Sequence, residues 1–295
     1  MKYIFSIIIP HYNIPELLVR CLKSIPVRED IQVIVVDDCS PNADTYKERF
    51  PEFSRPYLEW YSTPIGGSAG RARNIGLQHA KGKWLLFADS DDFYVPNMYD
   101  ILSSHVNDDA EVIYYKADSV DTITLLPSDR QIDRNNSIDA FYSGDVTAKE
   151  SALWFTVVWG QMISRDFIIH NNIRFDETIV SNDVMFAAKV ACLAKKLSVQ
   201  NEVLYVITSR ENSLHDSKRK DAKRYIVEQE VALRFHRYIS KQEVKRTPPC
   251  MLKVIQGAYQ TWGMRAAIDT TKMVIMEHAL FYGFGEYIKR HIIKL

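Results

Sequence analysis

The sequence predicts an α/β fold, a mostly parallel sheet with flanking helices, followed by a helical C-terminal extension. Three observations predict it. Short apolar runs alternate with amphipathic runs over residues 1–115, the pattern of strands joined by crossover helices. Aspartate-rich clusters follow two of these apolar runs directly. Residues 217–295 are helix-rich and carry many Lys and Arg on their polar faces.

The first two strands are near-continuous apolar runs. Residues 4–9 (Ile-Phe-Ser-Ile-Ile-Ile) end at Pro10, as expected of a strand covered on both faces. Asn13 is the expected cap of a helix with Pro15 at or near its first position. Residues 31–36 form the second buried strand, which ends in Asp37-Asp38. The turn-rich segment after it leads into a short helix near 43–50.

The same alternation continues to residue 115. Residues 57–61 are strand-like, and a glycine-rich turn then opens a helix over roughly 68–80. The apolar strand 84–88 runs straight into Asp89-Ser90-Asp91-Asp92. The remaining elements of this half are a helix from about Pro96 and a strand over 111–115.

The second half is patterned less regularly. Residues 117–145 are polar and are expected to form a variable excursion or hairpin. Apolar patterning returns from Trp154 to Val206, with a helix expected over 183–196 and a strand over 198–206. The sequence shows no internal repeat and no low-complexity tract.

Composition bounds the class of protein. The chain has 295 residues with 46% hydrophobic and 25% charged content, enough for a sizeable core. Lys plus Arg equals Asp plus Glu at 37 each, so no whole-chain basic field indicates nucleic acid. The four cysteines are scattered without a C-x-x-C pair, which favours reduced thiols and a cytoplasmic compartment.

The N-terminal apolar run is not expected to be a signal peptide. It is short, is interrupted by Ser6 and Pro10, and is followed by no small-residue cleavage site. No window approaches the roughly 18 uninterrupted apolar residues that a membrane span needs. An integral membrane protein is therefore not expected.

Ligands of open parallel sheets bind beyond the carboxyl ends of the strands, and the aspartate clusters lie at those ends. In an extended strand end, Asp89 and Asp91 point to the same side. Two close carboxylates need a cation or donors to offset their repulsion, and Mg²⁺ or Mn²⁺ binds carboxylates together with substrate phosphates. A metal–diphosphate site is one interpretation of this cluster. A solvated acidic turn is the other.

Three further segments are candidates. Asp37-Asp38 suits a uracil N–H or ribose hydroxyls, or is only an acidic turn. Residues 66–74 (GGSAGRARN) offer backbone N–H groups at a helix start and two guanidinium groups, which suit a diphosphate. The same segment matches G-x-S-x-G, so a hydrolase with Ser68 as nucleophile is a remote rival. Asp183 precedes an amphipathic run and is either a helix cap or a general base.

The eight histidines show no metal-binding spacing. His11 follows Pro10 at a strand end and lines the expected pocket. His215 either completes a metal site or lies in a loop, and the loop is favoured.

In this order the motifs resemble the inverting glycosyltransferases of family 2, which have the GT-A fold, a Rossmann-like sheet with flanking helices. The stretches that carry the resemblance are FSIIIPHYN (5–13), VVDDCS (35–40), GRARNIG (70–76), WLLFADSDD (84–92) and WGQMISRDFIIHNNIRFDETIVSND (159–183). The resemblance covers about residues 3–208, and the ordered set is highly specific. It implies a catalytic domain over 1–215, with a nucleotide-binding half 1–115 and an acceptor-side half 116–215, and a helical region over 216–295.

The resemblance also implies roles by position. The nucleotide-sugar would be bound by Pro10, Tyr12, Asp38, Arg73, Asn74, Asp89 and Ser90. Asp91 would hold the metal, Mn²⁺ or Mg²⁺, and Asp183 would be the catalytic base. Asn182 stands where the family has Glu, so a contact usually made by that Glu is not expected. The Q-x-x-R-W motif of processive synthases is absent, which points to a single transfer.

The implied reaction is an inverting transfer of one sugar, UDP-linked, to a hydroxyl of a saccharide or lipid-linked saccharide in bacterial polysaccharide assembly. A sugar-phosphate nucleotidyltransferase and a non-catalytic nucleotide-sugar binder are the alternatives. The stretch 281–295 mixes aromatics with Lys289, Arg290 and Lys294. It is expected either to rest peripherally on the inner face of the cell membrane or to pack on the catalytic domain.

Overall fold

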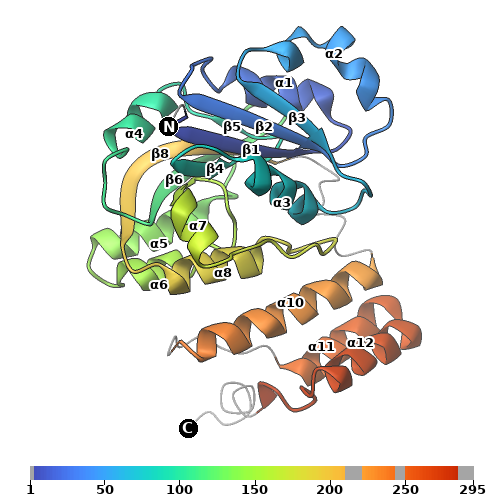
Figure 1. Ribbon diagram of the computed structural model, residues 1–295. Helices are drawn as coiled ribbons and strands as arrows, with labels where there is room; N and C mark the ends of the chain where they lie inside the picture. Colours follow the sequence, from blue (N-terminus) through green and yellow to red (C-terminus); the bar gives the residue numbers. More distant parts are fainter. Residues whose placement is uncertain (1–2, 210–220, 243–249, 285–295) are drawn as a thin grey trace. The chain divides into compact units, whose positions relative to one another are not determined.

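The structure is a computed structural model that describes residues 3–209, 221–242 and 250–284. It divides into two compact units, drawn in Figure 1. The first unit is Met1–Glu177 with Phe186–Arg210, and the second unit is Thr178–Met185 with Glu211–Leu295. The boundary runs through α8 (Val184–Leu193), whose first two residues belong to the second unit.

The first unit is built on a mixed sheet. In the described part of the chain its eight strands lie in the order β3-β2-β1-β4-β7-β6-β8-β5. β1 is parallel to β2 and to β4, β2 is parallel to β3, and β6 is parallel to β8. β7 runs antiparallel to both β4 and β6, and β5 antiparallel to β8. The strands are β1 (Phe5–His11), β2 (Ile31–Asp37), β3 (Leu58–Ser62), β4 (Trp84–Phe87), β5 (Phe93–Tyr94), β6 (Val112–Asp121), β7 (Gln161–Ser164) and β8 (Leu197–Ser209).

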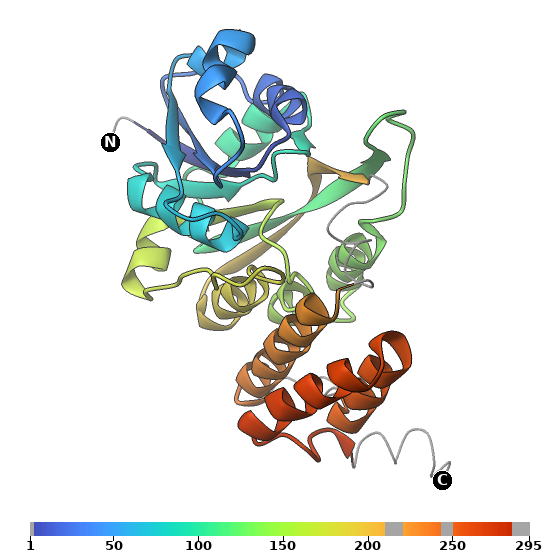
Figure 2. The ribbon, with the colours of Figure 1, turned by 90° about the vertical axis from the view of Figure 1, so that its right-hand side faces the viewer.

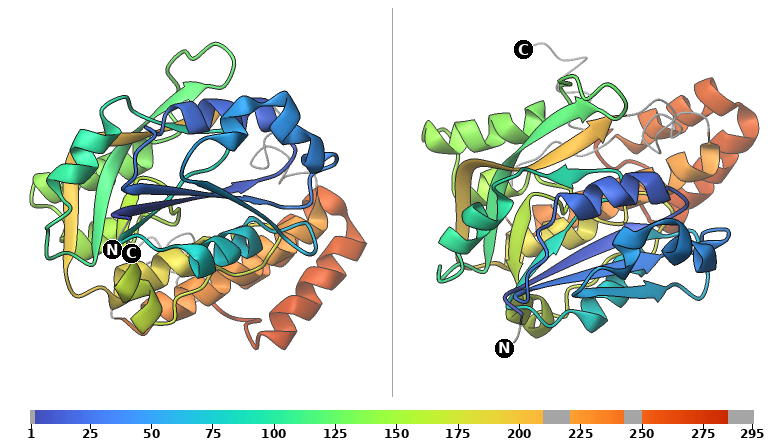
Figure 3. Two further views of the ribbon diagram at one scale, coloured as in Figure 1. Left: turned by 45° about the horizontal axis from the view of Figure 1, so that its top comes forward. Right: turned by 90° about the horizontal axis from the view of Figure 1, so that it is seen from above.

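Helices cover both faces of this sheet. Figure 3 shows α1 and α2 on one side of the β1–β3 strands and α3 on the other. Short 3-10 turns, Ala43–Thr45 and Pro51–Ser54, flank α2. The helices of the first unit are α1 (Pro15–Lys23), α2 (Tyr46–Arg49), α3 (Ala69–His79), α4 (Met98–Ser104), α5 (Ile132–Tyr142), α6 (Ala148–Ala152), α7 (Arg165–His170) and the larger part of α8.

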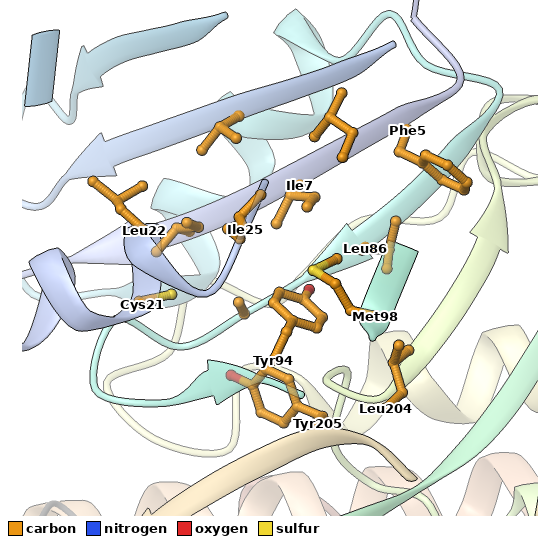
Figure 4. Close-up of a cluster of buried hydrophobic side chains, with 14 of the residues drawn as sticks. Phe5, Ile7, Cys21, Leu22, Ile25, Leu86, Tyr94, Met98, Leu204 and Tyr205 are labelled. Atoms are coloured by element: carbon orange, nitrogen blue, oxygen red, sulfur yellow. The ribbon is translucent and has the colours of Figure 1, made fainter. Parts of the chain in front are cut away.

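Alternate side chains of β1 serve the two faces. Ile7 belongs to a buried cluster with Leu22 of α1 (Figure 4), and each such fully buried side chain stabilises the fold by roughly 1.5–3 kcal/mol. Ile8 faces α3, where a Cβ on Gly76 would lie 2.4 Å from the Ile8 Cγ2 atom. Only glycine permits this approach. α3 therefore packs directly on β1 and begins beside the carboxyl ends of the strands.

One prediction for the first unit was wrong, and another was correct only in part. Asn13 does not cap α1, because its φ is 51° and its N–H donates to the Ser40 hydroxyl, which leaves Ile14 at the cap position. The excursion or hairpin predicted over 117–145 is present only in part: an antiparallel bridge joins Val120 to Pro127, but β6 runs to Asp121 before it and α5 follows it. On α5, the buried Arg134 side chain donates to the carbonyls of Tyr115 and Gly160.

The second unit is helical, as predicted. Its long helices are α10 (Ala222–Ser240), α11 (Met251–Trp262) and α12 (Met264–Met276), seen from a second side in Figure 2. They share a small apolar core that includes Leu233, Met251 and Val274. None of the helices that the structure describes is both long and apolar enough to cross a bilayer. His215 and residues 285–295 lie outside the described residues.

Candidate functional site

The carboxyl ends of four parallel strands meet at one edge of the sheet. His11 of β1 is in register with Asp37 of β2, and Asp37 with Ser62 of β3. β4 ends at Phe87, and the acidic turn, residues 89–92, follows it. The polar motifs found in the sequence therefore gather where ligands of such sheets bind.

Asp37 anchors the loop after β2 from inside. Its carboxylate accepts from His11 Nδ1 at 2.9 Å and from the Ser40 N–H at 2.8 Å, and Asp37 is 1% exposed. The Ile14 N–H points at His11 Nε2, so that nitrogen is the acceptor and Nδ1 carries the proton. Burial acts to raise the pKa of Asp37, but the hydrogen bonds from His11 and Ser40 outweigh it and hold the pKa below its usual range.

Asp38 is hydrogen-bonded to the glycine-rich turn. Its Oδ2 accepts from the N–H groups of Gly67 and Ser68 at 2.7 and 2.8 Å, and its Oδ1 accepts from the Thr63 hydroxyl at 2.8 Å. A Cβ on Gly66 would lie 2.9 Å from the Asp38 carbonyl oxygen, so the turn requires glycine there. Asp38 thus sets the loop that opens α3. Beside it, Pro10 is buried in β1.

Tyr12 and Ser68 differ sharply in exposure. Tyr12, just beyond β1, is 57% exposed, which leaves its ring available to a ligand. Ser68 is 4% exposed, has extended backbone at φ −151°, and caps α3 by accepting from the Arg71 N–H. A nucleophile elbow instead presents its serine on a sharp, strained turn. The hydrolase interpretation does not fit this geometry.

The polar side chains of α3 connect three segments. Arg73 Nη2 lies 2.6 Å from Asp89 Oδ1, and the Arg73 side chain is 6% exposed. The Asn74 amide donates to the Phe175 carbonyl at 3.0 Å and accepts from the Phe175 N–H at 2.9 Å. Arg71 pairs with Glu177 at 2.8 Å. Arg73 therefore reaches the acidic turn, whereas Asn74 fixes the segment that begins at Phe175.

The acidic turn is held by residues that the sequence did not single out. The Asp89 N–H donates to the Tyr205 hydroxyl at 2.8 Å. The Asp91 carbonyl accepts from Arg20 Nη2 at 2.6 Å and from the Thr208 hydroxyl at 2.9 Å. No periodicity or motif signals these contacts, because they join positions as many as 117 residues apart.

Asp92 and Ser90 face inward. They are 4% and 6% exposed, and Asp92 Oδ1 accepts from the Thr208 N–H at 2.7 Å. Burial raises the pKa of Asp92 well above its usual range, and the charges of Asp91 and Asp89 raise it further. The turn therefore directs Asp92 into the protein and leaves Asp89 and Asp91 half-buried at the edge.

The carboxylates of the acidic turn suit a divalent cation that a bound diphosphate also coordinates. Among the described residues, no three His, Cys, Asp or Glu side chains form a group that could bind a metal alone. Mg²⁺ and Mn²⁺ are commonly bound by one or two carboxylates plus substrate phosphates and waters. Asp89 is ion-paired with Arg73, and the resemblance assigns the metal to Asp91.

Asp183 directly precedes α8, as the sequence predicted for a helix start, and belongs to the second unit. The segment before it is tightly turned: Ser181 has a φ of 53°, and the Thr178 hydroxyl donates to the Val180 carbonyl at 2.7 Å. A helix N-terminus favours a carboxylate at this position.

Sequence comparisons match this chain to glycosyltransferases. A model described as Glycosyl transferase family 2 matches residues 6–162. YibD of Escherichia coli, described as an uncharacterized glycosyltransferase, is 26% identical over 68% of this chain. The poly(ribitol-phosphate) β-N-acetylglucosaminyltransferase TarS of Staphylococcus aureus is 25% identical over 72% of this chain. The chain spans 60% of the length of YibD and 37% of that of TarS.

Solved structures show the same fold. TarS 1–349 in complex with UDP-GlcNAc superposes with a TM-score of 0.61 at 22% identity, covering 94% of this chain and 84% of that one. The mannosyltransferase PcManGT of Pyrobaculum calidifontis, in complex with GDP-Man and Mn²⁺, gives 0.55 at 15% identity, covering 94% and 76%. Sequence identities this low bear on the fold alone. The superpositions confirm the predicted GT-A fold.

Proposed function

Because the chain belongs to glycosyltransferase family 2, we propose that it transfers one sugar from a nucleotide-sugar to an acceptor hydroxyl with inversion. The observation that carries this proposal is the acidic turn at the carboxyl end of β4, with Arg73 paired to Asp89 and Asp91 beside it. TarS has been solved with UDP-GlcNAc, which supports a UDP-linked donor. The polymer named in the description of TarS supports a role in cell-surface polysaccharide assembly, with a saccharide or lipid-linked saccharide as acceptor.

Each group has a chemical task in this reaction. Asp183 takes the proton of the acceptor hydroxyl as that oxygen attacks the anomeric carbon from the face opposite the nucleotide. Asp91 would hold a divalent cation, Mn²⁺ or Mg²⁺, which when bound would neutralise charge on the departing diphosphate. Pro10, Tyr12 and Asp38 border the base, while Arg73 and Asp89 hold the diphosphate side of the donor. The resemblance also assigns Asn74 and Ser90 to that side, but Asn74 is hydrogen-bonded to Phe175 and Ser90 faces inward. A single displacement without a covalent intermediate inverts the anomeric centre.

A thiol at the expected base site offers a direct test. Cys39 follows Asp38, is exposed, and has its Sγ 3.2 Å from the Thr63 carbonyl oxygen. We expect the correct nucleotide-sugar, with Mn²⁺, to slow alkylation of Cys39 at least fivefold, because base and ribose cover the end of β2. Alkylation rates measured by mass spectrometry across a panel of UDP-, GDP- and TDP-sugars would rank the donors.

The other cysteines serve as internal references. Cys250, at the start of α11, should react at the same rate with and without nucleotide. Cys21 and Cys192 should react slowly throughout, because burial raises the pKa of both thiols. If no nucleotide in the panel protected Cys39 from alkylation, that result would contradict a donor site at this edge.

We also propose that the second unit contacts an anionic membrane surface at the inner face of the cell membrane. Residues 211–295 carry 16 Lys and Arg against 9 Asp and Glu, whereas residues 1–210 carry 21 against 28. On α12, Met264, Ile268 and Ile275 are 63%, 47% and 57% exposed and share one side of the helix. Exposed apolar side chains in a basic unit are typical of a helix that lies on anionic lipid.

Vesicle sedimentation tests this contact. The chain should bind phosphatidylglycerol vesicles and not phosphatidylcholine vesicles, and Ile268→Ser with Ile275→Ser should weaken binding at least tenfold. Ile123→Ser is the matched control, because Ile123 is 88% exposed in the first unit. Equal binding of both variants, or no binding of the unaltered chain, would contradict the proposal.

A further inference from the structure

One strand holds the acidic turn at three points. Tyr205 of β8 accepts from the Asp89 N–H, the Thr208 hydroxyl donates to the Asp91 carbonyl, and the Thr208 N–H donates to the Asp92 carboxyl group. The turn thus has few ways to shift while β8 stays in place.

β8 is itself firmly held. Val120 of β6 is the parallel partner of Thr208, and Tyr94 of β5 is the antiparallel partner of Tyr205. The rings of Tyr94 and Tyr205 pack edge to face at 5.1 Å within the core drawn in Figure 4. Thr208 is 1% exposed. The strand that contacts the acidic turn is therefore part of the rigid sheet rather than of a loop.

The Asp91 carbonyl oxygen accepts hydrogen bonds from two elements. Arg20 of α1 donates to it at 2.6 Å and the Thr208 hydroxyl at 2.9 Å, and a carbonyl oxygen has two lone pairs. The same Arg20 guanidinium donates to the Thr122 carbonyl at 2.9 Å, which ties it to the end of β6. With both lone pairs used, the peptide plane after Asp91 is fixed, and the direction of the Asp91 side chain is restricted with it.

We infer that Thr208 is a positioning residue for the cation site: its hydroxyl orients the Asp91 backbone so that the Asp91 carboxylate meets the metal. This inference rests on the proposed function of Asp91. A carboxylate held in its binding geometry before the metal arrives loses less conformational freedom on binding, so its affinity for the metal is higher. The hydroxyl acts only through Asp91 and touches neither donor nor acceptor.

The test compares Thr208→Val with Thr208→Ser. Valine keeps the branched shape and the backbone N–H to Asp92 but removes the hydroxyl, whereas serine keeps the hydroxyl. We expect Thr208→Val to weaken Mn²⁺ binding in the presence of UDP about fivefold, the size of one net hydrogen bond, and Thr208→Ser to restore it. Mn²⁺ affinity is measured by electron paramagnetic resonance of free Mn²⁺, and UDP affinity without metal by calorimetry.

Thr270→Val is the matched control. Thr270 is also fully buried and donates its hydroxyl to a carbonyl, that of Ala266, but it lies in α12. The Thr270→Val variant should leave Mn²⁺ affinity unchanged. Tyr205→Phe is a second, independent variant, which should also weaken Mn²⁺ binding because the Asp89 N–H loses its acceptor.

The outcomes separate the two proposals. If the unaltered chain binds no Mn²⁺ with UDP, the proposed metal site fails and this inference with it. If the unaltered chain binds Mn²⁺ and Thr208→Val binds it equally well, the proposed function stands and the positioning role of Thr208 is wrong. A loss that Thr208→Ser does not restore would likewise overturn it.

Discussion

Replacing Asp183 with asparagine is expected to slow sugar transfer roughly 10²–10⁴-fold, the usual contribution of a general base. Asparagine has nearly the same size but cannot accept the proton that the attacking hydroxyl releases. Asp183 stands directly before α8, where asparagine remains an acceptable cap, so the fold should persist. Turnover is measured as UDP release with a saccharide acceptor, and nucleotide affinity is measured on the same samples.

The matched control for this variant is Asp166→Asn. Asp166 lies on α7 with a side chain that is 86% exposed, so the same loss of charge there should leave the rate unchanged. Unaltered turnover of Asp183→Asn would remove its role as base. Loss of nucleotide binding in that variant would instead give Asp183 a structural role.

Replacing Asp91 with asparagine is expected to lower turnover roughly a hundredfold or more, since a metal supplies several kcal/mol of charge stabilisation to such a reaction. The neutral amide is a much weaker ligand for Mn²⁺ than a carboxylate. The loss should shrink as Mn²⁺ concentration rises, because mass action partly offsets the weaker affinity. A titration of rate against Mn²⁺ measures both quantities.

Two comparisons make this prediction specific to Asp91. Asp100→Asn, an exposed position on α4, should keep the Mn²⁺ dependence of the unaltered chain. Asp89→Asn removes the partner of Arg73 and should weaken binding of the donor more than of the metal. If Asp89→Asn lost Mn²⁺ affinity and Asp91→Asn kept it, the metal ligand would be Asp89.

Much of the first unit could be predicted because buried parallel strands have a simple signature. β1 and β2 are covered on both faces, so they read as apolar runs, and each ends where polar residues begin. That boundary predicts that Asp37, Asp38 and the acidic turn lie at one edge of the sheet. α3 starts at that edge, which brings its Arg73 within reach of Asp89, although the sequence does not predict this ion pair.

The rest depends on contacts between distant residues. The polar sequence of α5 does not indicate a packed helix, yet its Arg134 donates to the backbone of β6 and of Gly160. β7 enters the sheet antiparallel between β4 and β6, which no local pattern announces. No local sequence pattern predicts the contacts of Tyr205 and Thr208 with the acidic turn either, because these residues are far apart in the chain.

The hydrogen bonds of the Asp38 carboxylate also cannot be predicted from the sequence. Its carboxylate is satisfied by Thr63, Gly67 and Ser68, and hydrogen-bond partners at this range cannot be counted from spacing alone. The role of Asp38 toward a base therefore depends on how it shapes the turn as much as on its charge.

The most direct test is a crystal structure of the chain with UDP and Mn²⁺, with anomalous scattering recorded at the manganese edge. We expect one strong peak within about 2–2.5 Å of an Asp91 carboxylate oxygen and of phosphate oxygens of UDP. A diphosphate bound away from the acidic turn, or a manganese peak that Asp91 does not touch, would contradict it.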